Sequence, residues 1–191
     1  VTNMNAMFMG WNYAERGLKS LDLSNFDTSN VTDMSGMFAG RMYLESLNIS
    51  NFNTSKVTDM TSMFSSCRSL KNLNLSSFDT QNVSRMAFMF EYCRELESLD
   101  LRSFNTALVE DFGQMFNGCV KMRSLLFDTA KFSTANATVL GSMFMECNAL
   151  ESLDVSKFNT SKCDYIIQMF CGCKSLTELD VSNFDLSEAT D

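Results

Sequence analysis

Residues 44–67, LESLNISNFNTSKVTDMTSMFSSC, contain the pattern that decides the fold. Around Leu47 and Ile49 apolar and polar residues alternate, which is typical of a half-buried β-strand. From Val57 to Cys67 the apolar residues stand three and four positions apart, a spacing that predicts a short helical or 3₁₀ turn. The segment therefore predicts one strand, one corner and one turn.

The same pattern recurs seven times along the chain. Successive Met-Phe dipeptides are 30, 26, 26, 26, 28 and 26 residues apart, and a leucine series and a second phenylalanine series keep the same period. One unit of this length cannot bury its own apolar side chains, so neighbouring units must stack into a continuous core. We therefore expect an α/β repeat solenoid, with a parallel sheet on one face and short helical or irregular turns on the other. The strand leucines of the seven units are Leu21, Leu47, Leu73, Leu99, Leu125, Leu153 and Leu179.

The ends of the sequence carry the repeat rather than a cap. Val1 has the same phase as Val31, and the last residues, ending at Asp191, return to that phase. Solenoids need polar terminal caps, and neither end resembles one. We expect residues 1–191 to form a single solenoid of seven repeats that is a piece of a longer array and could associate end to end.

The composition argues against several functional classes. The 15 basic and 23 acidic side chains give a net charge of −8, which argues against a nucleic-acid groove and against attraction to anionic lipid. Histidine is absent, which excludes a Ser-His-Asp triad, a Cys-His pair and any histidine-ligated metal. The longest apolar runs are a few residues, so we expect no membrane span. We predict no catalytic residue, no metal and no cofactor.

Residues 20–38, SLDLSNFDTSNVTDMSGMF, strongly resemble the 26-residue repeat family of bacterial surface proteins, which belongs with the BspA-like leucine-rich repeats. The resemblance covers essentially the whole chain and is weakest in the fifth unit. It implies a right-handed leucine-rich-repeat solenoid displayed on a cell surface, in a lipoprotein or wall-anchored protein of a bacterium or, in some relatives, a protist. It implies adhesion only loosely, because a fold does not fix a function.

Two columns of equivalent residues have structural explanations. The cysteine column could be a disulfide ladder or a file of metal ligands, but neighbours about 4.8 Å apart with parallel Cβ vectors fit neither, so we expect small buried core residues. Trp11 and Arg41 take the cysteine position in the first two units, and Cys171 lies outside the column and is the expected reactive thiol. In the Asp/Asn-Thr column, the Asp and Asn side chains should stabilise tight turns of the backbone by accepting its amides. The alternative is that a threonine array orders water. The cysteine column is Cys67, Cys93, Cys119, Cys147 and Cys173.

The strand face holds the candidate ligand site. The residue between the two buried strand positions must point outward, and it is Asp or Asn in every unit except the fifth, which has Leu126. The neighbouring column alternates in charge. The simpler explanation of this column is that the alternation relieves repulsion between coils. Calcium held by Asp22, Asn48 and Asn74 is a further alternative to ligand binding. The predicted ligand-binding residues are Lys71, Asn74, Glu97, Asp100, Arg123, Leu126, Glu151 and Asp154.

Three functions are compatible with these patterns. The first is a surface adhesion or binding module that recognises a protein or glycan on a host or neighbouring cell. The second is a passive spacer that displays another domain, and the third is an intracellular protein-interaction scaffold, which fits the seven cysteines if they are reduced. The strand-face columns vary more than the turn columns, which favours binding.

Overall fold

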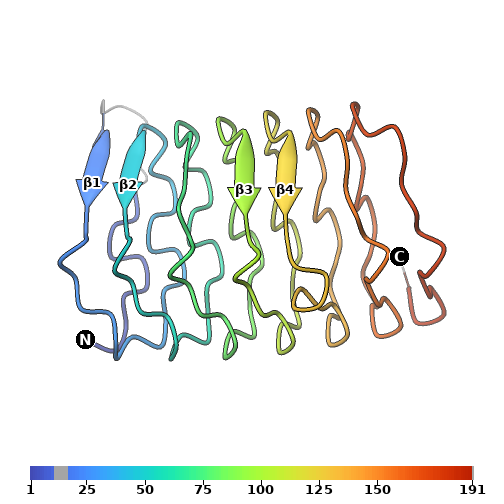
Figure 1. Cartoon of the computed structure of the whole chain (residues 1–191), viewed down its shortest axis with the longest axis horizontal. Coiled ribbons are helices and arrows are strands. Elements are labelled where there is room, and N and C mark those ends of the chain that lie inside the picture. Colours follow the sequence, from blue (N-terminus) through green and yellow to red (C-terminus); the bar gives the residue numbers. More distant parts are fainter. Residues whose placement is uncertain (11–16, 191) are drawn as a thin grey trace.

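In the computed structural model, which describes residues 1–10 and 17–190, the chain winds as successive coils stacked side by side along one axis (Figure 1). We number the coils by their strand leucines, from coil one at Leu21 to coil seven at Leu179. Trp11 lies outside the described residues. The repeat solenoid predicted from the 26-residue period is the fold of this chain.

The predicted parallel sheet is present only in part. The strands β1 (Ser20–Asp22) and β2 (Ser46–Asn48) pair in parallel, as do β3 (Ser98–Asp100) and β4 (Ser124–Leu126). Leu21 lies opposite Leu47 in the first pair. The described part of coils three, six and seven contains no strand, so two short sheets replace the continuous one that we expected.

The continuous ladder lies on the opposite side of the solenoid. Single parallel bridges join Asn3 to Asp33, Asp33 to Asp59, and so on through every coil to Tyr165. The amides of Met34, Gly36 and Phe38 donate to carbonyls of the next coil at 2.8–3.1 Å, whereas the amides of Met37 and Ala39 donate three residues back in their own coil at 3.2 and 3.0 Å. Along this segment, some backbone amides therefore bond to the next coil, while those between them close tight turns within their own coil.

The turns opposite the strands are irregular, which is one of the two forms that we predicted, and not helical. Residues 1–10 and 17–190 contain no helix, and therefore no helix that is long and apolar enough to cross a membrane. Gly36 and Gly40 have φ values of 61° and 73°, each at the third residue of a turn closed by an i to i+3 bond, as in a type II turn. Tight turns repeated along the chain bring every third or fourth side chain inward, so they imitate the spacing of a helix.

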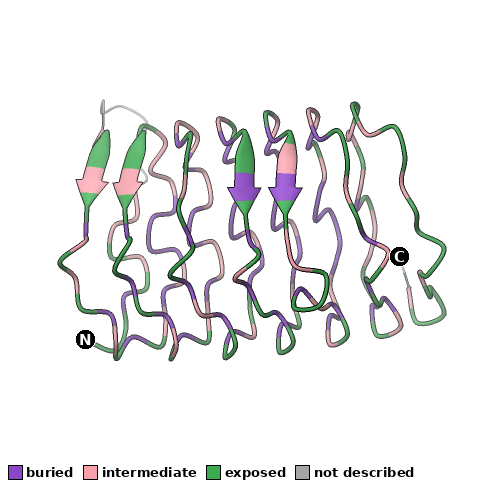
Figure 2. Cartoon of the chain, viewed as in Figure 1, coloured by how far each residue is buried: buried purple, intermediate pink, exposed green. Residues whose placement is uncertain are grey.

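The core is a set of stacked columns that run the length of the solenoid (Figure 2). The Met-Phe phenylalanines stack ring on ring from Phe8 to Phe170, with centroids 5.5–5.8 Å apart and interplanar angles of 10° or less. Met34, Met37 and the cysteines at positions 67, 93, 119 and 147 are also fully buried. Each coil therefore completes the core of its neighbours.

The threonine of the Asp/Asn-Thr column joins one coil to the next. The hydroxyl of buried Thr80 donates to the Asn105 carbonyl and accepts from the Asn105 amide, both at 2.8 Å. Thr28, Thr54, Thr106, Thr134 and Thr160 make the same pair of bonds with the next coil. The column is structural, as predicted, but the threonine acts between coils.

Candidate functional site

The outward-pointing Asp and Asn side chains of the strand face end the strands. Oδ1 of Asp22 accepts the Ser24 amide at 2.9 Å, and Oδ1 of Asn74 accepts the Ser76 amide at 3.0 Å. Backbone donation to the carboxylate lowers the pKa of Asp22. These Asx turns give the column a structural role that its position alone did not reveal.

All eight predicted ligand-binding residues are exposed on the strand face of coils three to six. Arg123 Nη1 lies 3.8 Å from Glu151 Oε1, and in the same column Lys19 Nζ lies 2.8 Å from Glu45 Oε1. The charge alternation therefore forms ion pairs between coils at these two places. Ligand binding by the eight residues stays a prediction.

Coil three interrupts the hydrogen bonding of the strand face, as coils six and seven also do. In the described part of the chain, the backbone N–H and C=O groups of residues 71–74 have no protein partner. On either side the sheet is closed: the Leu23 amide donates to the Asn48 carbonyl at 2.9 Å, and the Leu101 amide to the Leu126 carbonyl at 2.7 Å. Figure 1 shows the coil-three segment between β2 and β3 without an arrow. The opposite side of coil three remains bridged, Asp59 to Arg85.

Two open hollows flank this segment, and together we call them the coil-three groove. One, of about 480 Å³, lies toward β2, and the other, of about 520 Å³, lies toward β3 and coil five. Leu73, Asn74 and Asp100 line both. The remaining lining residues are Glu45, Ser46, Leu47, Asn72 and Ser98 in the first, and Leu75, Ser76, Arg102, Ser103, Asp128 and Lys131 in the second.

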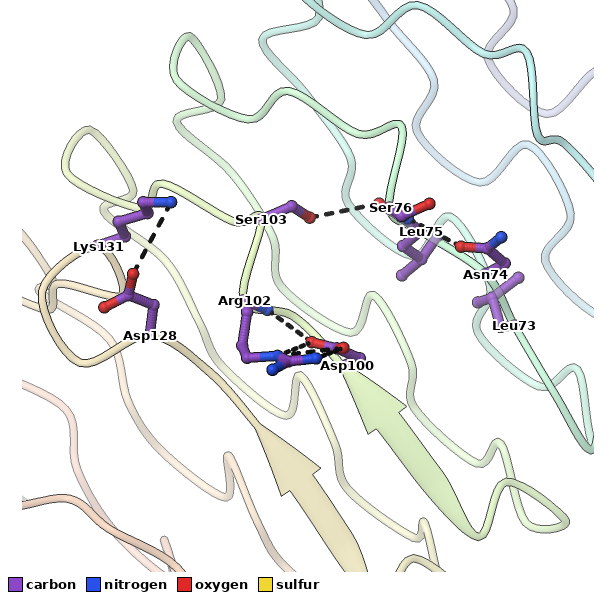
Figure 3. Close-up of a pocket in the computed structure, with 9 residues that line it drawn as sticks. All are labelled: Leu73, Asn74, Leu75, Ser76, Asp100, Arg102, Ser103, Asp128 and Lys131. Carbon is purple, nitrogen blue, oxygen red and sulfur yellow. Dashed lines mark hydrogen bonds and ion pairs between the residues drawn. The ribbon is translucent and has the colours of Figure 1, made fainter.

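Two ion pairs form the wall of the second hollow opposite Asn74 (Figure 3). Arg102 Nη2 lies 2.6 Å from Asp100 Oδ2, and Lys131 Nζ lies 3.8 Å from Asp128 Oδ2. The hydrogen bonds from the Arg102 side chain and backbone lower the pKa of Asp100 to about 2. Both cations of this wall are therefore neutralised by their own neighbours.

The sequence prediction missed Arg102, Asp128 and Lys131. Arg102 stands where coils two and three have Ser50 and Ser76, and Lys131 follows the two-residue insertion of coil five. Both departures from the repeat are visible in the sequence. Only the three-dimensional stacking places them beside the same hollow.

The predicted site residues do not form one cluster. Asn74 and Asp100 line the coil-three groove, and Glu97 and Arg123 line a separate hollow of about 290 Å³. Leu126 is 47% exposed. Lys71, Leu126, Glu151 and Asp154 border none of these three hollows.

The cysteines are arranged as core residues. Cys93 Sγ donates to the Phe64 carbonyl at 3.2 Å, and the other column cysteines make the same bond at 3.1–3.3 Å. Burial raises the pKa of the Cys67 and Cys119 thiols to about 12. Cys171 is exposed, as predicted. The described residues contain no group of three cysteine or acidic side chains suited to a metal ion.

Comparison with known proteins supports the fold. The chain is similar to the crystal structure of a leucine rich cell surface protein from Faecalibacterium prausnitzii A2-165, with a TM-score of 0.55, 17% identity, and coverage of 93% of this chain and 42% of that one. It also matches a leucine-rich repeat protein from Eubacterium ventriosum ATCC 27560, with a TM-score of 0.45, 20% identity, and coverage of 81% and 37%. The chain thus spans less than half the length of each. Among curated proteins no sequence matches.

A family model matches residues 2–126 and again residues 98–191, so that the two matches together cover nearly all of the repeats. On that match the chain belongs to the family described as Mycoplasma protein of unknown function, DUF285.

Proposed function

We propose that this chain is a ligand-binding repeat module displayed on a cell surface, and that it catalyses no reaction. The likeness to a leucine rich cell surface protein supports the location. The resemblance of residues 20–38 to BspA-like repeats supports the same reading. The ligand is a protein or glycan on another cell or in the surrounding matrix.

The observation that carries the proposal is the coil-three groove. Two departures from the repeat meet there, beside the unpaired backbone of residues 71–74: Arg102 in a serine column, and the insertion that Lys131 follows. A passive spacer requires only coils that stack, and regular repeats already supply them. Departures gathered on one face, beside an open hollow, fit recognition of a ligand better than spacing.

The intracellular scaffold is the weaker alternative. Its support is the presence of seven cysteines that a reducing compartment would keep as thiols, but the buried cysteines fill core positions and bond to carbonyls of the preceding coil. Such thiols are inert in any compartment because they are inaccessible and protonated. The cysteines therefore give no preference for the cytosol.

The test is binding of the purified chain to an array of immobilised glycans and matrix proteins. Wild type is compared with two double variants, Arg102→Ser with Lys131→Ser, and Arg123→Glu with Leu126→Asp. Lys157→Ser is the control, because Lys157 occupies the register position of Lys131 in the next coil and does not line the coil-three groove. All variants are first compared by circular dichroism.

Saturable binding that one double variant reduces and Lys157→Ser leaves unchanged is the expected result. It would also identify which part of the strand face makes the contact. Absence of binding by folded wild-type protein across the array would contradict the proposal and favour the spacer.

A further inference from the structure

The backbone of coil three presents hydrogen-bonding groups that the fold itself leaves open. The N–H and C=O groups of residues 71–74 bond to no other described part of the protein. Backbone groups of this kind must bond to water or to a ligand, because an unsatisfied one costs the free energy of a lost hydrogen bond. The groove therefore holds a row of donors and acceptors that a ligand could take over from water.

The geometry of the gap selects against a peptide strand. Strand addition needs a free sheet edge, but coil three has a neighbouring coil on each side. These neighbours are fixed by the bridges on the opposite side, Asp59 to Arg85 and Arg85 to Asp111. A hydroxyl group fits better, since it is both donor and acceptor, rotates freely and is similar in size to the water that it replaces.

The side chains around the gap also match a sugar. Leu73 and Leu75 supply apolar surface for the C–H face of a ring, and Asn74 supplies a planar amide. The cations carry no free charge toward the ligand, because Arg102 pairs with Asp100 and Lys131 with Asp128 (Figure 3). With a chain charge of −8, an uncharged ligand suits this groove better than an acidic one. Further hydroxyl and amide groups come from Asn72, Ser76, Ser98 and Ser103.

We propose that the coil-three groove binds a neutral oligosaccharide, whose hydroxyl groups replace water on the unpaired backbone groups of residues 72–74. This inference rests on the proposed function and names the ligand class. It assigns Asn74 and Asp100 to the wall of the subsite and adds Arg102 and Lys131 as contact residues.

The experiment is a titration of the ¹⁵N-labelled chain with three neutral hexasaccharides: hexa-N-acetylchitohexaose, cellohexaose and mannohexaose. Each is raised to about 10 mM, ten times the dissociation constant of about 1 mM typical of weak binding in an open site. The expected result is that at least one probe shifts the amide signals of residues 71–74 and slows their hydrogen exchange. Without a probe, these amides should exchange much faster than the amide of Leu101, which is bonded to coil five.

The double variant Arg102→Ser, Lys131→Ser restores residues that other coils have at these positions, so it should fold. We expect it to weaken saccharide binding about tenfold, because bonds to charged donors are lost. Lys157→Ser should bind as the wild type does.

The inference is overturned if none of the three hexasaccharides shifts these amides, or if the shifts occur elsewhere and the double variant binds equally well. If matrix proteins still bind in the array experiment while the saccharides fail here, the proposed function stands and the sugar subsite falls. If nothing binds in either experiment, both fall.

Discussion

Replacing Thr80 by valine tests whether the threonine column holds the coils together. The Thr80 hydroxyl makes two bonds of 2.8 Å, one to the Asn105 amide and one to the Asn105 carbonyl, and Thr80 is 1% exposed. Valine has nearly the same shape, so it leaves no cavity but removes both bonds. It also leaves two backbone groups of Asn105 facing a methyl group.

The size of the effect follows from these two bonds. A typical hydrogen bond contributes about 1 kcal/mol net, and a backbone group left unsatisfied costs about 1–3 kcal/mol. The Asn105 side chain is exposed, so water relieves part of the loss on that side. We therefore expect Thr80→Val to lower the free energy of unfolding by about 2–4 kcal/mol. Thr80→Ser keeps both bonds and should lose only about 1 kcal/mol for the missing methyl group.

The assay is urea denaturation followed by far-UV circular dichroism, combined with native-state hydrogen exchange of the Asn105 amide. The exchange measurement is needed because long repeat arrays can unfold in steps, for which a single free energy is not defined. Thr58→Val is the matched control. Thr58 is exposed and its hydroxyl donates one bond of 3.2 Å to the Thr32 carbonyl, so its change should stay within about 0.5 kcal/mol. Equal stabilities of Thr80→Val and Thr58→Val, or a serine variant as unstable as the valine variant, would refute the reasoning.

Three further predictions concern thiols, acid and one turn. A thiol reagent at pH 8 should modify Cys171 rapidly in the native chain and all seven cysteines in denaturant, and Cys171→Ser should remove the fast phase; fast reaction of Cys67, whose pKa burial raises to about 12, would contradict the assigned core. The native pKa values of Asp22, Asp154 and Asp180 are lowered by hydrogen bonds in their Asx turns. These carboxylates therefore stabilise the folded chain above the ordinary Asp pKa of 3.8, and this stabilisation is lost as the pH falls through the lower native pKa values. Changing all three to Asn keeps the hydrogen-bond acceptor but removes the titration, so the urea midpoint should vary less with pH between about pH 5 and pH 2. Gly118→Ala should destabilise the chain by about 1–3 kcal/mol, because Gly118 has a φ of 72° and its added Cβ would clash with the Tyr92 ring; thermal unfolding of the variant unchanged from wild type would contradict this.

The sequence period was sufficient to predict the stacking, and the core followed from it. Phe64, Met60 and Cys67 are buried because successive coils present equivalent side chains at the same height, so a column faces the core in successive coils. The period was not sufficient to predict the backbone between them. Spacing by three fits a helix and a chain of tight turns equally well, and the turns prevail because alternate amides bond to the next coil. Residues with positive φ that are not glycine, such as Phe88 and Tyr92, gave no warning of these turns.

The candidate site was only partly predictable for a different reason. Asn74 and Asp100 were found because they face outward on a predicted strand, and both line the coil-three groove. The apolar pattern of coil three, with Leu70, Leu73 and Leu75, is the same as in coils that pair, so nothing in it predicts the open ladder. Which residues meet across the groove depends on the stacking of coils three to five, and a pattern within one repeat does not contain that information.

The insertion of coil five explains how a regular solenoid could acquire such a groove without losing its fold. In other coils the outward Asp or Asn accepts the amide two residues on and ends the strand, as Asp100 does with Arg102 at 3.0 Å. Coil five has Leu126 at this position, and Asp128 makes the equivalent turn with the Ala130 amide at 2.9 Å. The turn has thus moved along the chain by two residues, which is the length of the insertion. This shift releases the side chain at position 126 from forming the turn and places Lys131 beside the second hollow, while Phe132 keeps its buried place in the core column. Because the replacement of an Asx residue by leucine and the insertion compensate each other, they are best understood as one change, and its effect falls on the strand face rather than on the core.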